Sequence, residues 1–437
     1  MTVIGIDDTD SREAGMCTTY LAARIADRLA AADDWTVDRR LLVRLNPAVE
    51  HKTRGNAALA IHTDAPVDAA REIVREELPL AETDDPRTNP GVVLTSESAA
   101  AMPDAVRDFA REAVRDFHDV ADARELIDRF EYDALEAGNG RGLIGALAAL
   151  GAWQAVEDWT YEYISYREPE RRGTPREVDA ESVFAAAEAG YPDAWDTVDR
   201  GEGELVCVPH APGPILHGIR GDDPDVVREV AAGIESEPVE RTSLFVTNQG
   251  TDAHLREGTV EIVRDGRAYR VTGTVSEPPE TREGGHVFLT VADGSRTDLA
   301  DGEGVVDETG EALPCAAFEP TKRFRDRVRA LRVGDRVTVC GEVTDGTLKL
   351  EKFAVRDLVR TERVTPTCPD CGRTMESAGR GQGYRCRDCD TTAEGKAERE
   401  IDRDLEDGWY EVPPCARRHI AKPLVRGGFD APVHPER

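Results

Sequence analysis

The chain has 437 residues, enough for two to four domains that each bury a core of their own. Its formal net charge of -31 would ordinarily argue against a nucleic-acid partner. However, only six lysines accompany forty-nine arginines, and acidic residues number 86, a composition that suits solubility in a salt-rich cytoplasm where charges are screened. We therefore interpret the acidity as a sign of habitat, which leaves nucleic acid open as a partner.

The sequence also bounds the compartment. No apolar run approaches the roughly 18 residues that a membrane span requires, and no charged-then-apolar leader opens the chain, so we expect a cytoplasmic protein without a membrane partner. The nine cysteines are an odd number, and four of them form two Cys-x-x-Cys pairs. This pattern argues against a disulfide framework and favours metal ligation in a reducing compartment.

The first predicted strand, residues 3–6, ends in three carboxylates, those of Asp7, Asp8 and Asp10. A helix with apolar residues at every fourth position is predicted soon after it, over residues 16–32. Carboxylate oxygens beside a helix start suit Mg²⁺ and a phosphate. An Asp-rich turn that merely caps the helix is the alternative.

Two hydroxyl side chains, Thr18 and Thr19, fall in the first turn of that helix and favour a nucleotide site. Further along, Lys52 is the only lysine in the first 300 residues, and it stands near Arg54 in a loop between two predicted strands. Because lysine is so rare in this chain, these two cations are candidate phosphate contacts. A solvated loop explains them equally well.

A glycine-rich loop at residues 138–145 reads Gly-Asn-Gly-Arg-Gly-Leu-Ile-Gly and opens an Ala- and Leu-rich helix. Residues 126–136, which precede it, do not have the pattern of a strand, so its Gly-x-Gly-x-x-Gly match is weak evidence for a dinucleotide site. Backbone N–H groups of such a loop can still bind phosphate, with a simple tight turn as the alternative. The candidate phosphate-binding residues are Gly138, Asn139, Gly140, Arg141 and Gly142.

A polar loop follows a strand that is predicted to end near residue 247. It carries Asn248 and Asp252, whose side chains could bind a small polar ligand. A loop held by its own hydrogen bonds explains the same residues equally well.

Between residues 258 and 360 the chain changes to short β-branched strands joined by Asp-Gly turns, with one helix predicted before the last hairpin. This order is typical of an OB-fold β-barrel. The helix region is the most basic stretch of the chain and favours a surface that stacks bases and follows a nucleic-acid backbone, with a solvated helix face as the alternative. The candidate RNA-binding residues there are Arg323, Phe324, Arg325 and Arg329.

Cys368, Cys371, Cys386 and Cys389 form two Cys-x-x-Cys pairs that are separated by fourteen residues. This spacing is typical of a zinc ribbon, in which four thiolates complete the coordination of a structural metal and leave no catalytic position. The segment after the ribbon, residues 397–437, carries a basic cluster and is expected to contact RNA.

In this order, the motifs resemble the archaeal 2-agmatinylcytidine synthetase family, which acts on the AUA-decoding isoleucine tRNA. The segments that carry the resemblance are 4–11, 15–21, 46–47, 52–56, 138–145 and 247–254. The resemblance implies a multidomain α+β fold. Its expected parts are a kinase-like α/β domain and a ferredoxin-like domain within residues 1–255, an OB-fold barrel in 256–362, a zinc ribbon in 363–396 and a tail in 397–437.

The resemblance also implies an activity. The family joins agmatine to carbon 2 of the wobble cytidine, with ATP as co-substrate and through a phosphorylated cytidine, so that the tRNA reads AUA instead of AUG. On this basis Asp7, Asp8 and Asp10 are expected to hold Mg²⁺ and the phosphates, and Thr18 matches the threonine that the family autophosphorylates. Agmatine, a dication, is expected to bind carboxylates and the loop with Asn248. An acidic, lysine-poor member of the family would suit a haloarchaeon.

Two other classes of protein remain open from the residues alone. A metal-dependent phosphatase could use the Asp8-Thr9-Asp10 motif, although Arg12 stands where such motifs usually have Thr or Val. A non-catalytic RNA-binding protein could use the barrel and the ribbon, with the N-terminal part as a scaffold. The second class would not consume ATP in the presence of cognate tRNA and agmatine.

Overall fold

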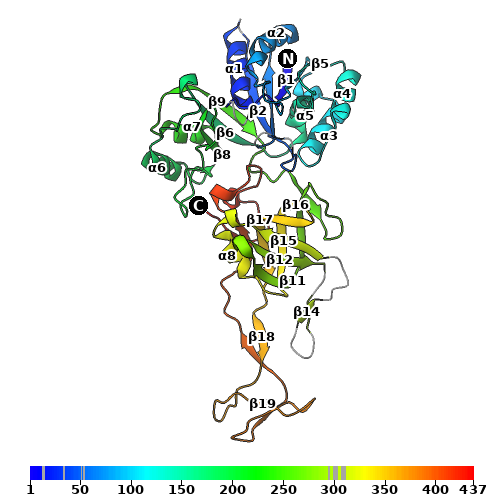
Figure 1. Ribbon diagram of the computed structural model, residues 1–437, viewed down its shortest axis with the longest axis vertical. Coiled ribbons are helices and arrows are strands. Elements are labelled where there is room, and N and C mark those ends of the chain that lie inside the picture. The colour runs from blue at the N-terminus through cyan, green and yellow to red at the C-terminus, as the bar shows by residue number, and fades with distance from the viewer. Residues whose placement is uncertain are drawn as a thin grey trace.

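The computed structural model describes residues 1–11, 15–32, 35–50, 52, 55–293, 296–298, 304–306 and 312–437. The molecule is elongated, with the N-terminal strands and helices at one end, a barrel of strands in the middle and the four-cysteine segment at the far end (Figure 1). Among the helices that the structure describes, none combines the length and the apolarity needed to cross a bilayer. The architecture is mixed α/β and divided into several parts.

A nine-stranded sheet organises the N-terminal part, in the order β5-β4-β1-β3-β2-β9-β6-β8-β7. Its strands are β1 Thr2–Asp7, β2 Val37–Arg44, β3 Ala57–Thr63, β4 Gly91–Thr95, β5 Asp133–Glu136, β6 Thr160–Arg167, β7 Ala194–Trp195, β8 Ile215–Gly221 and β9 Val239–Thr247. All neighbours are antiparallel except β2 and β9, which run parallel. This parallel pair joins two halves of the sheet, β1 to β5 and β6 to β9.

Helices cover both faces of the sheet. They are α1 Thr18–Ala31, α2 Val67–Glu77, α3 Asp104–Ala113, α4 Val120–Arg129, α5 Gly142–Ala155, α6 Ala180–Gly190 and α7 Pro224–Ala232. One core lies beneath α1 and α2 and includes Ile4, Leu42 and Phe245. A second core joins the opposite face to α3, α4 and α5, and a third packs α6 and α7 on β8. Burial of these apolar side chains is the main force that holds the layers together.

The strand β5 differs from the sequence-based expectation, because residues 126–136 were expected to contain no strand. β5 is a short edge strand that pairs antiparallel with β4, and its side chains are partly or fully exposed. With only one neighbour and no buried face, it lacks the apolar pattern that identifies a strand in sequence. The glycine-rich loop therefore does follow a strand, but outside a parallel βαβ unit.

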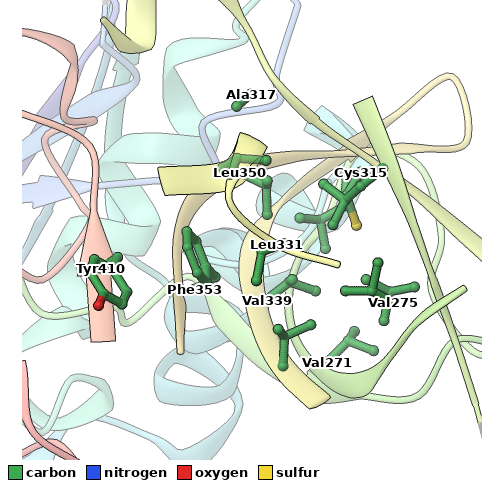
Figure 2. Packing of buried hydrophobic residues seen from close by; sticks show 14 of the residues in the cluster. Val271, Val275, Cys315, Ala317, Leu331, Val339, Leu350, Phe353 and Tyr410 are labelled. Carbon is green, nitrogen blue, oxygen red and sulfur yellow. The ribbon is translucent and has the colours of Figure 1, made fainter. Parts of the chain in front are cut away.

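Five strands close into a barrel in the middle of the molecule. They are β11 Ala268–Thr281, β12 Val287–Ala292, β15 Ala312–Ala317, β16 Arg336–Thr344 and β17 Thr347–Asp357. β11 pairs with β12 and β16, β12 pairs with β15, and β17 completes the ring by pairing with β16 and, in parallel, with β15. Helix α8, Phe324–Arg329, stands between β15 and β16. Figure 2 shows Val271, Val275 and Val339 among the apolar side chains that fill the ring.

The residues after the barrel leave it and then return. β18 (Thr361–Val364) and β22 (Ala397–Glu400) form a two-stranded stalk, beyond which lie β19 (Glu376–Ser377), β20 (Tyr384–Arg385) and β21 (Thr392–Ala393) (Figure 1). The chain then adds β23 (Gly408–Glu411) to β17, and β24 (Val433–His434) to β23. The remaining short strands are β10 (Leu255–Gly258), which pairs with β11, and the pair β13 (Arg296–Asp298) and β14 (Gly304–Val306). The segment expected as a tail is thus divided between the stalk and the barrel sheet.

Ion pairs of one polarity join the N-terminal part to the barrel and its returning segment. In each of them the carboxylate comes from residues 116–252 and the cation from residues 256–437. The pairs are Asp116 with Arg256 and Arg267, Asp158 and Asp222 with Arg426, Glu188 with Arg437, Asp196 with Arg417, Asp199 with Arg323, Glu202 with Lys322 and Arg323, and Asp252 with Lys352. At the same junction, His254 of the N-terminal part and Glu351 of the barrel form a hydrogen bond of 3.1 Å, and here the carboxylate belongs to the barrel. The barrel core, by contrast, contains no residue before Val260 among those that the structure describes.

We expect the Asp252–Lys352 pair to be essential for the stability of this junction. The Lys352 side chain is 1% exposed, and its Nζ donates to both Asp252 carboxylate oxygens at 2.9 and 2.7 Å. Asp252→Asn should lower the free energy of unfolding by about 3 kcal/mol, because it leaves a buried ammonium without a counter-charge. Denaturant unfolding measures the loss.

The double variant Asp252→Asn/Lys352→Met removes both charges and should recover most of that stability. Asp225→Asn, which opens an exposed pair with Arg228, is the matched control and should cost less than about 1 kcal/mol. An Asp252→Asn protein as stable as the wild type would contradict this account of the junction.

Candidate active site at one edge of the sheet

One edge of the nine-stranded sheet collects polar residues from both of its halves. A row of paired residues, Ile6, Leu59, Leu42, Thr247 and Thr160, runs across the sheet just inside this edge. The polar residues that follow the row are Asp7 at the end of β1, Asp8 and Asp10 after it, Arg44 at the end of β2, and Asn248 and Gln249 after β9. Residues that are far apart in the sequence therefore meet along one line.

The acidic turn after β1 is held by hydrogen bonds of its own. Asp8 has a positive φ of 56°, and its N–H donates to Asp7 Oδ1 at 2.7 Å. Arg141, just before α5, donates from Nη2 and Nε to Asp8 Oδ2 at 2.7 and 3.1 Å. The Asp10 carbonyl accepts from Thr88 Oγ1 at 2.7 Å. The turn thus brings three carboxylates and one guanidinium to the end of β1.

The electrostatics of this turn favour a cation. Desolvation raises the pKa of Asp7 well above its usual value, and the charges of Asp8 and Asp10 raise it further. Desolvation also raises the pKa of Asp8, although Arg141 opposes that change. The charged forms of these carboxylates are therefore costly until a positive charge is bound. Within the described part of the chain, however, only the four cysteines place three or more ligand atoms close enough together for one ion.

The backbone N–H groups of the glycine-rich loop make hydrogen bonds within the chain. Asn139 N–H donates to Asn89 Oδ1 at 3.0 Å, Arg141 N–H to Asn139 Oδ1 at 2.9 Å, and Gly142 N–H to the Asn89 carbonyl at 3.0 Å. The Gly140 N–H is directed to the Ala137 carbonyl at 3.4 Å. These donors are bonded within the chain, so the role of the loop backbone in phosphate binding stays a prediction. Arg141 contributes its side chain to the edge.

The glycines around α5 serve a second purpose, which is close approach. A Cβ on Gly145 would lie 1.9 Å from Asp7 Oδ2, and one on Gly142 would lie 2.3 Å from the Gly91 nitrogen. A Cβ on Gly91 would lie 2.1 Å from the carbonyl carbon of Gly142. Helix α5 can therefore lie directly on β1 and β4, and its first turn reaches the acidic residues.

Helix α1 begins beside Tyr166 on β6, six residues along that strand from Thr160. Thr18 is its first residue and is buried, and the preceding Cys17 places its sulfur 3.1 Å from Thr19 Oγ1. Burial raises the pKa of Tyr166 on β6, and the nearby Cys17 thiol raises it further, which locates the start of α1 beside the second half of the sheet. The first turn of α1 contains no acidic residue, so its N–H groups and helix dipole favour an anion.

A second polar cluster, which the sequence analysis missed, lies on the β6–β9 half of the edge. Arg44 Nη2 donates to Gln249 Oε1 at 3.0 Å, and Gln249 Nε2 donates to Glu162 Oε2. Glu162 on β6 stands opposite Arg220 on β8 in the antiparallel register. In the sequence, Glu162 and Arg220 are each a charged residue within a strand. A charged residue in a strand usually marks the side that faces solvent, so this pattern does not by itself predict a site.

The hypothesis that Asn248 and Asp252 bind a small ligand is not supported. Asn248 is fully buried, accepts from the Arg44 N–H at 2.7 Å and donates to the Arg44 carbonyl at 3.0 Å, so its side chain extends the β2–β9 ladder. Asp252 pairs with Lys352 and accepts from the Lys422 N–H at 2.6 Å. Both side chains are bonded within the chain, as expected for a loop held by its own hydrogen bonds.

Lys52 and Arg54 are the two predicted phosphate contacts in the loop after β2, and the structure describes only the first of them. Lys52 is half-buried and donates from Nζ to the Pro47 carbonyl. Arg54 lies outside the described residues. Neither position is brought to the acidic turn by a contact that the structure shows, so their role in phosphate binding stays a prediction.

The basic helix of the barrel corrects one prediction. Phe324 is fully buried and packs on Phe353 at 5.6 Å between ring centroids, so it cannot stack on a base. Arg323 pairs with Asp199 at 3.0 Å and belongs to the junction. Arg325 donates to the Gly285 carbonyl at 2.7 Å, and Arg329 pairs with Asp326 at 2.6 Å. The apolar face of this short helix fills the barrel, which the dense arginines hide in the sequence.

The four cysteines beyond the stalk form a metal site. Their sulfur atoms lie within 4.8 Å of one another, with Cys368 and Cys386 buried and Cys371 and Cys389 exposed. The two knuckles have matching turns, in which Gly372 N–H donates to the Cys368 carbonyl at 2.9 Å and Asp390 N–H to the Cys386 carbonyl at 3.1 Å. Burial by itself would raise the pKa of the Cys368 thiol, but N–H donation from Cys371 and Asp370 lowers it to about 7. Four thiolates in this arrangement suit tetrahedral zinc.

Three family models match separate parts of the chain. The TiaS TCKD domain matches residues 3–68, the TiaS FLD domain matches residues 140–254, and the TiaS C-terminal zinc ribbon domain matches residues 365–405. The last match includes all four cysteines, and it confirms the zinc ribbon. The first two lie on the two halves of the sheet that share the polar edge.

Relatives match over the full length. The chain is 56% identical to the isoleucine-tRNA 2-agmatinylcytidine synthetase TiaS of Haloquadratum walsbyi, and 45% identical to the protein of the same name of Methanosarcina acetivorans. Each of these alignments covers 100% of both chains.

Solved structures match over the full length as well. A complex of TiaS with its isoleucine tRNA and ATP matches with a TM-score of 0.86 and 40% identity, and a complex with the tRNA, AMPCPP and agmatine with 0.83 and 39%. Each match covers 100% of this chain and 99% of the other. The fold is thus that of a class of tRNA-modifying enzymes. Within that class, the chain belongs to the TiaS family.

The close approach of α5 leads to a prediction about stability. Gly145→Ala should lower the free energy of unfolding by about 2 kcal/mol, because its Cβ overlaps Asp7 Oδ2 and forces the helix away from β1. Denaturant unfolding measures this. The matched control is Gly395→Ala in the ribbon segment, where a Cβ meets no atom within 4 Å and the cost should be negligible. Equal stability of the two variants would contradict the role of Gly145.

The ribbon leads to a second prediction. Cys386→Ser should release about one zinc ion per chain, because a closed thiolate site loses affinity when one of its four ligands is replaced. Metal analysis of the purified variant measures the loss. Cys415→Ser, which changes a cysteine outside the cluster, should keep its zinc. Intact protein that contains no zinc would refute the assignment.

Proposed function

We propose that this protein is an ATP-dependent ligase that joins agmatine to carbon 2 of the wobble cytidine of the AUA-decoding isoleucine tRNA. The observation that carries the proposal is full-length identity of 56% to an isoleucine-tRNA 2-agmatinylcytidine synthetase, together with polar residues from both matched domains along one edge. Solved relatives that cover the chain were crystallised with the isoleucine tRNA, ATP or AMPCPP, and agmatine. The product is 2-agmatinylcytidine, and its partners are the tRNA and agmatine.

The topology supports a finer assignment of the domains. Strands and helices of the second half follow the order β6-α6-β7-β8-α7-β9, and the strands lie in the order β9-β6-β8-β7, the βαββαβ arrangement of a ferredoxin-like domain. The first half, with the acidic turn, is the proposed kinase-like domain. The ring of five strands with α8 before its last hairpin supports an OB fold.

The chemistry requires that the cytosine carbonyl be activated. Its oxygen is a poor leaving group, so an amine displaces it only after phosphorylation. In the second step the amine nitrogen of agmatine forms a bond to carbon 2, the bond from carbon 2 to oxygen breaks, the oxygen leaves as part of phosphate, and the nitrogen loses a proton. The protein contributes mainly position and charge to such a transfer.

The acidic turn fits the charge requirement of the phosphoryl transfer. Asp7, Asp8 and Asp10 would hold Mg²⁺, which neutralises phosphate charge when it is bound. Because burial raises the pKa of Asp7, protons compete with a cation for this carboxylate up to a higher pH than usual, and affinity for the cation should rise with pH. Arg141 keeps Asp8 oriented and adds a guanidinium near the phosphates.

The start of α1 fits the acceptor of a phosphoryl group. Thr18 is the first residue of a helix whose opening turn carries no acidic side chain, so a phosphate there meets N–H groups and the positive end of the helix dipole. We assign Thr18 as the autophosphorylated residue. The alternative, a residue that only begins the helix, predicts no phosphate on the protein.

These roles are tested together by the nucleoside content of the tRNA and by label on the protein. Asp7→Asn, Asp8→Asn and Asp10→Asn should each abolish 2-agmatinylcytidine and leave tRNA binding intact, because they remove charge and leave the barrel unchanged. Thr18→Ala should lose protein label from ATP that is radioactive at the γ-phosphate. Nucleoside mass spectrometry after incubation with ATP and agmatine provides the first measurement, and autoradiography of the protein the second.

The matched control is Thr36→Ala, whose hydroxyl binds Asp64 at the other end of β2 and whose loss should change neither measurement. Unmodified tRNA from the wild-type protein would favour the non-catalytic RNA-binding class. Full product from all three Asp variants would exclude the acidic turn as the catalytic centre.

A further inference from the structure

We propose that the cluster of Arg44, Glu162, Arg220 and Gln249 binds the cytosine base that is modified and selects cytosine against uracil. The inference rests on the proposed function and adds to it the residues that read the base. None of these four residues was a candidate from the sequence.

The cluster presents one acceptor between donors. Glu162 and Arg220 are 8% and 5% exposed and stand opposite each other on β6 and β8. Gln249 joins Glu162 to Arg44 by donating to Glu162 and accepting from Arg44 at 3.0 Å. Arg220 Nη1 lies 3.9 Å from Asp196 Oδ2. A Cβ on Gly218 would lie 2.9 Å from Glu162 Oε1, so the absence of a side chain there keeps that oxygen accessible.

The cluster leaves some of its hydrogen-bond donors unused, in contrast to a buried arginine–glutamate pair elsewhere in the chain. The Nε atoms of Arg44 and Arg220 are buried and have no partner among the described residues. Arg167, at the other end of β6, makes a fully buried pair with Glu237, and its Nε, Nη1 and Nη2 all donate to protein oxygens. The donors of Arg167 are thus used within the chain, whereas Arg44 and Arg220 each keep an open Nε. The Nε atoms of Arg40, Arg172 and Arg256 are also buried without a partner in the described part of the chain, so it is the combination with the Glu162 carboxylate that distinguishes the cluster.

The open groups match cytosine. Its O2 and N3 are acceptors and its N4 amino group is a donor, whereas uracil presents the acceptor O4 in place of that amino group. A carboxylate only accepts and a guanidinium only donates. Glu162 would therefore accept from N4 while a guanidinium donates to O2 or N3, and uracil would set O4 against the carboxylate.

The position of the cluster fits the reaction as well. Desolvation lowers the pKa of Arg44, and the charges of Glu162 and of the Cys17 thiol raise it, so the residue that precedes Thr18 lies within electrostatic range of the cluster. A base held there has its carbon 2 side near the guanidinium groups. When the amine displaces the phosphorylated oxygen from carbon 2, negative charge develops on the departing phosphate, and those donors would stabilise it.

The test is the preference for cytosine over uracil in binding. Anticodon stem-loops with cytidine or uridine at the wobble position are bound to the wild type, to Glu162→Gln and to Glu237→Gln. The wild type should prefer cytidine by about tenfold or more, as expected for one well-placed base contact. Glu162→Gln should bring the ratio close to one, because its amide can also donate to O4 of uracil. Glu237→Gln, a buried pair of the same chemistry away from the edge, should keep the wild-type ratio.

A modified base provides a check that needs no altered protein. A stem-loop with pyrimidin-2-one, which lacks the 4-amino group, should bind the wild type about tenfold more weakly than the cytidine stem-loop and should show a much smaller loss with Glu162→Gln. An unchanged ratio in Glu162→Gln would overturn the proposal. The proposal would also be overturned if Glu162→Gln bound agmatine more weakly and kept the preference for cytidine, because the Glu162 carboxylate would then bind agmatine. If the wild type forms 2-agmatinylcytidine but binds the cytidine and uridine stem-loops equally well, only this inference fails. If the wild type forms no 2-agmatinylcytidine, the proposed function fails.

Discussion

Helix α5 lies so close to strands β1 and β4 that no side chain fits between them, and the acidic site depends on this contact. Gly5, Gly91, Gly142 and Gly145 provide the space, and in each case a Cβ would lie between 1.9 and 2.3 Å from a facing atom. Any larger residue would push the helix outward and with it Arg141, which precedes its first turn and orients Asp8. The glycine-rich loop therefore determines where charge is placed, although it offers few free N–H groups of its own.

The second constraint is the joint between the two halves of the sheet. Only Leu41 with Val246 and Leu42 with Thr247 pair directly in the parallel register, and the side chain of Asn248 extends the ladder by bonding both polar groups of the Arg44 backbone. This joint fixes the acidic turn relative to the cluster around Glu162. The barrel is then held against both halves by ion pairs, so the edge of the sheet and the barrel keep a defined spacing.

Much of this could be predicted from the sequence, for reasons that the structure makes clear. The strand ending at Asp7, the helix after Thr18 and the two Cys-x-x-Cys pairs are local patterns, and each forms where it was expected. Failures arose where tertiary contacts decide the role of a residue. Phe324 looked like a stacking residue but is one of the residues of the barrel core. Glu162 gave only the weak signal of a charged residue in a buried strand, because its hydrogen-bond partner Gln249 follows a strand far along the chain.

The central claim is that both halves of the edge act on one nucleotide. A crystal structure of this protein with an anticodon stem-loop and a non-hydrolysable ATP analogue tests it most directly. The account predicts that the wobble base is turned out of the loop and lies between Glu162 and Arg220, with the terminal phosphate of the analogue beside Asp7 and Thr18. A wobble base bound on the barrel or on the zinc ribbon, with the edge vacant, would contradict the account.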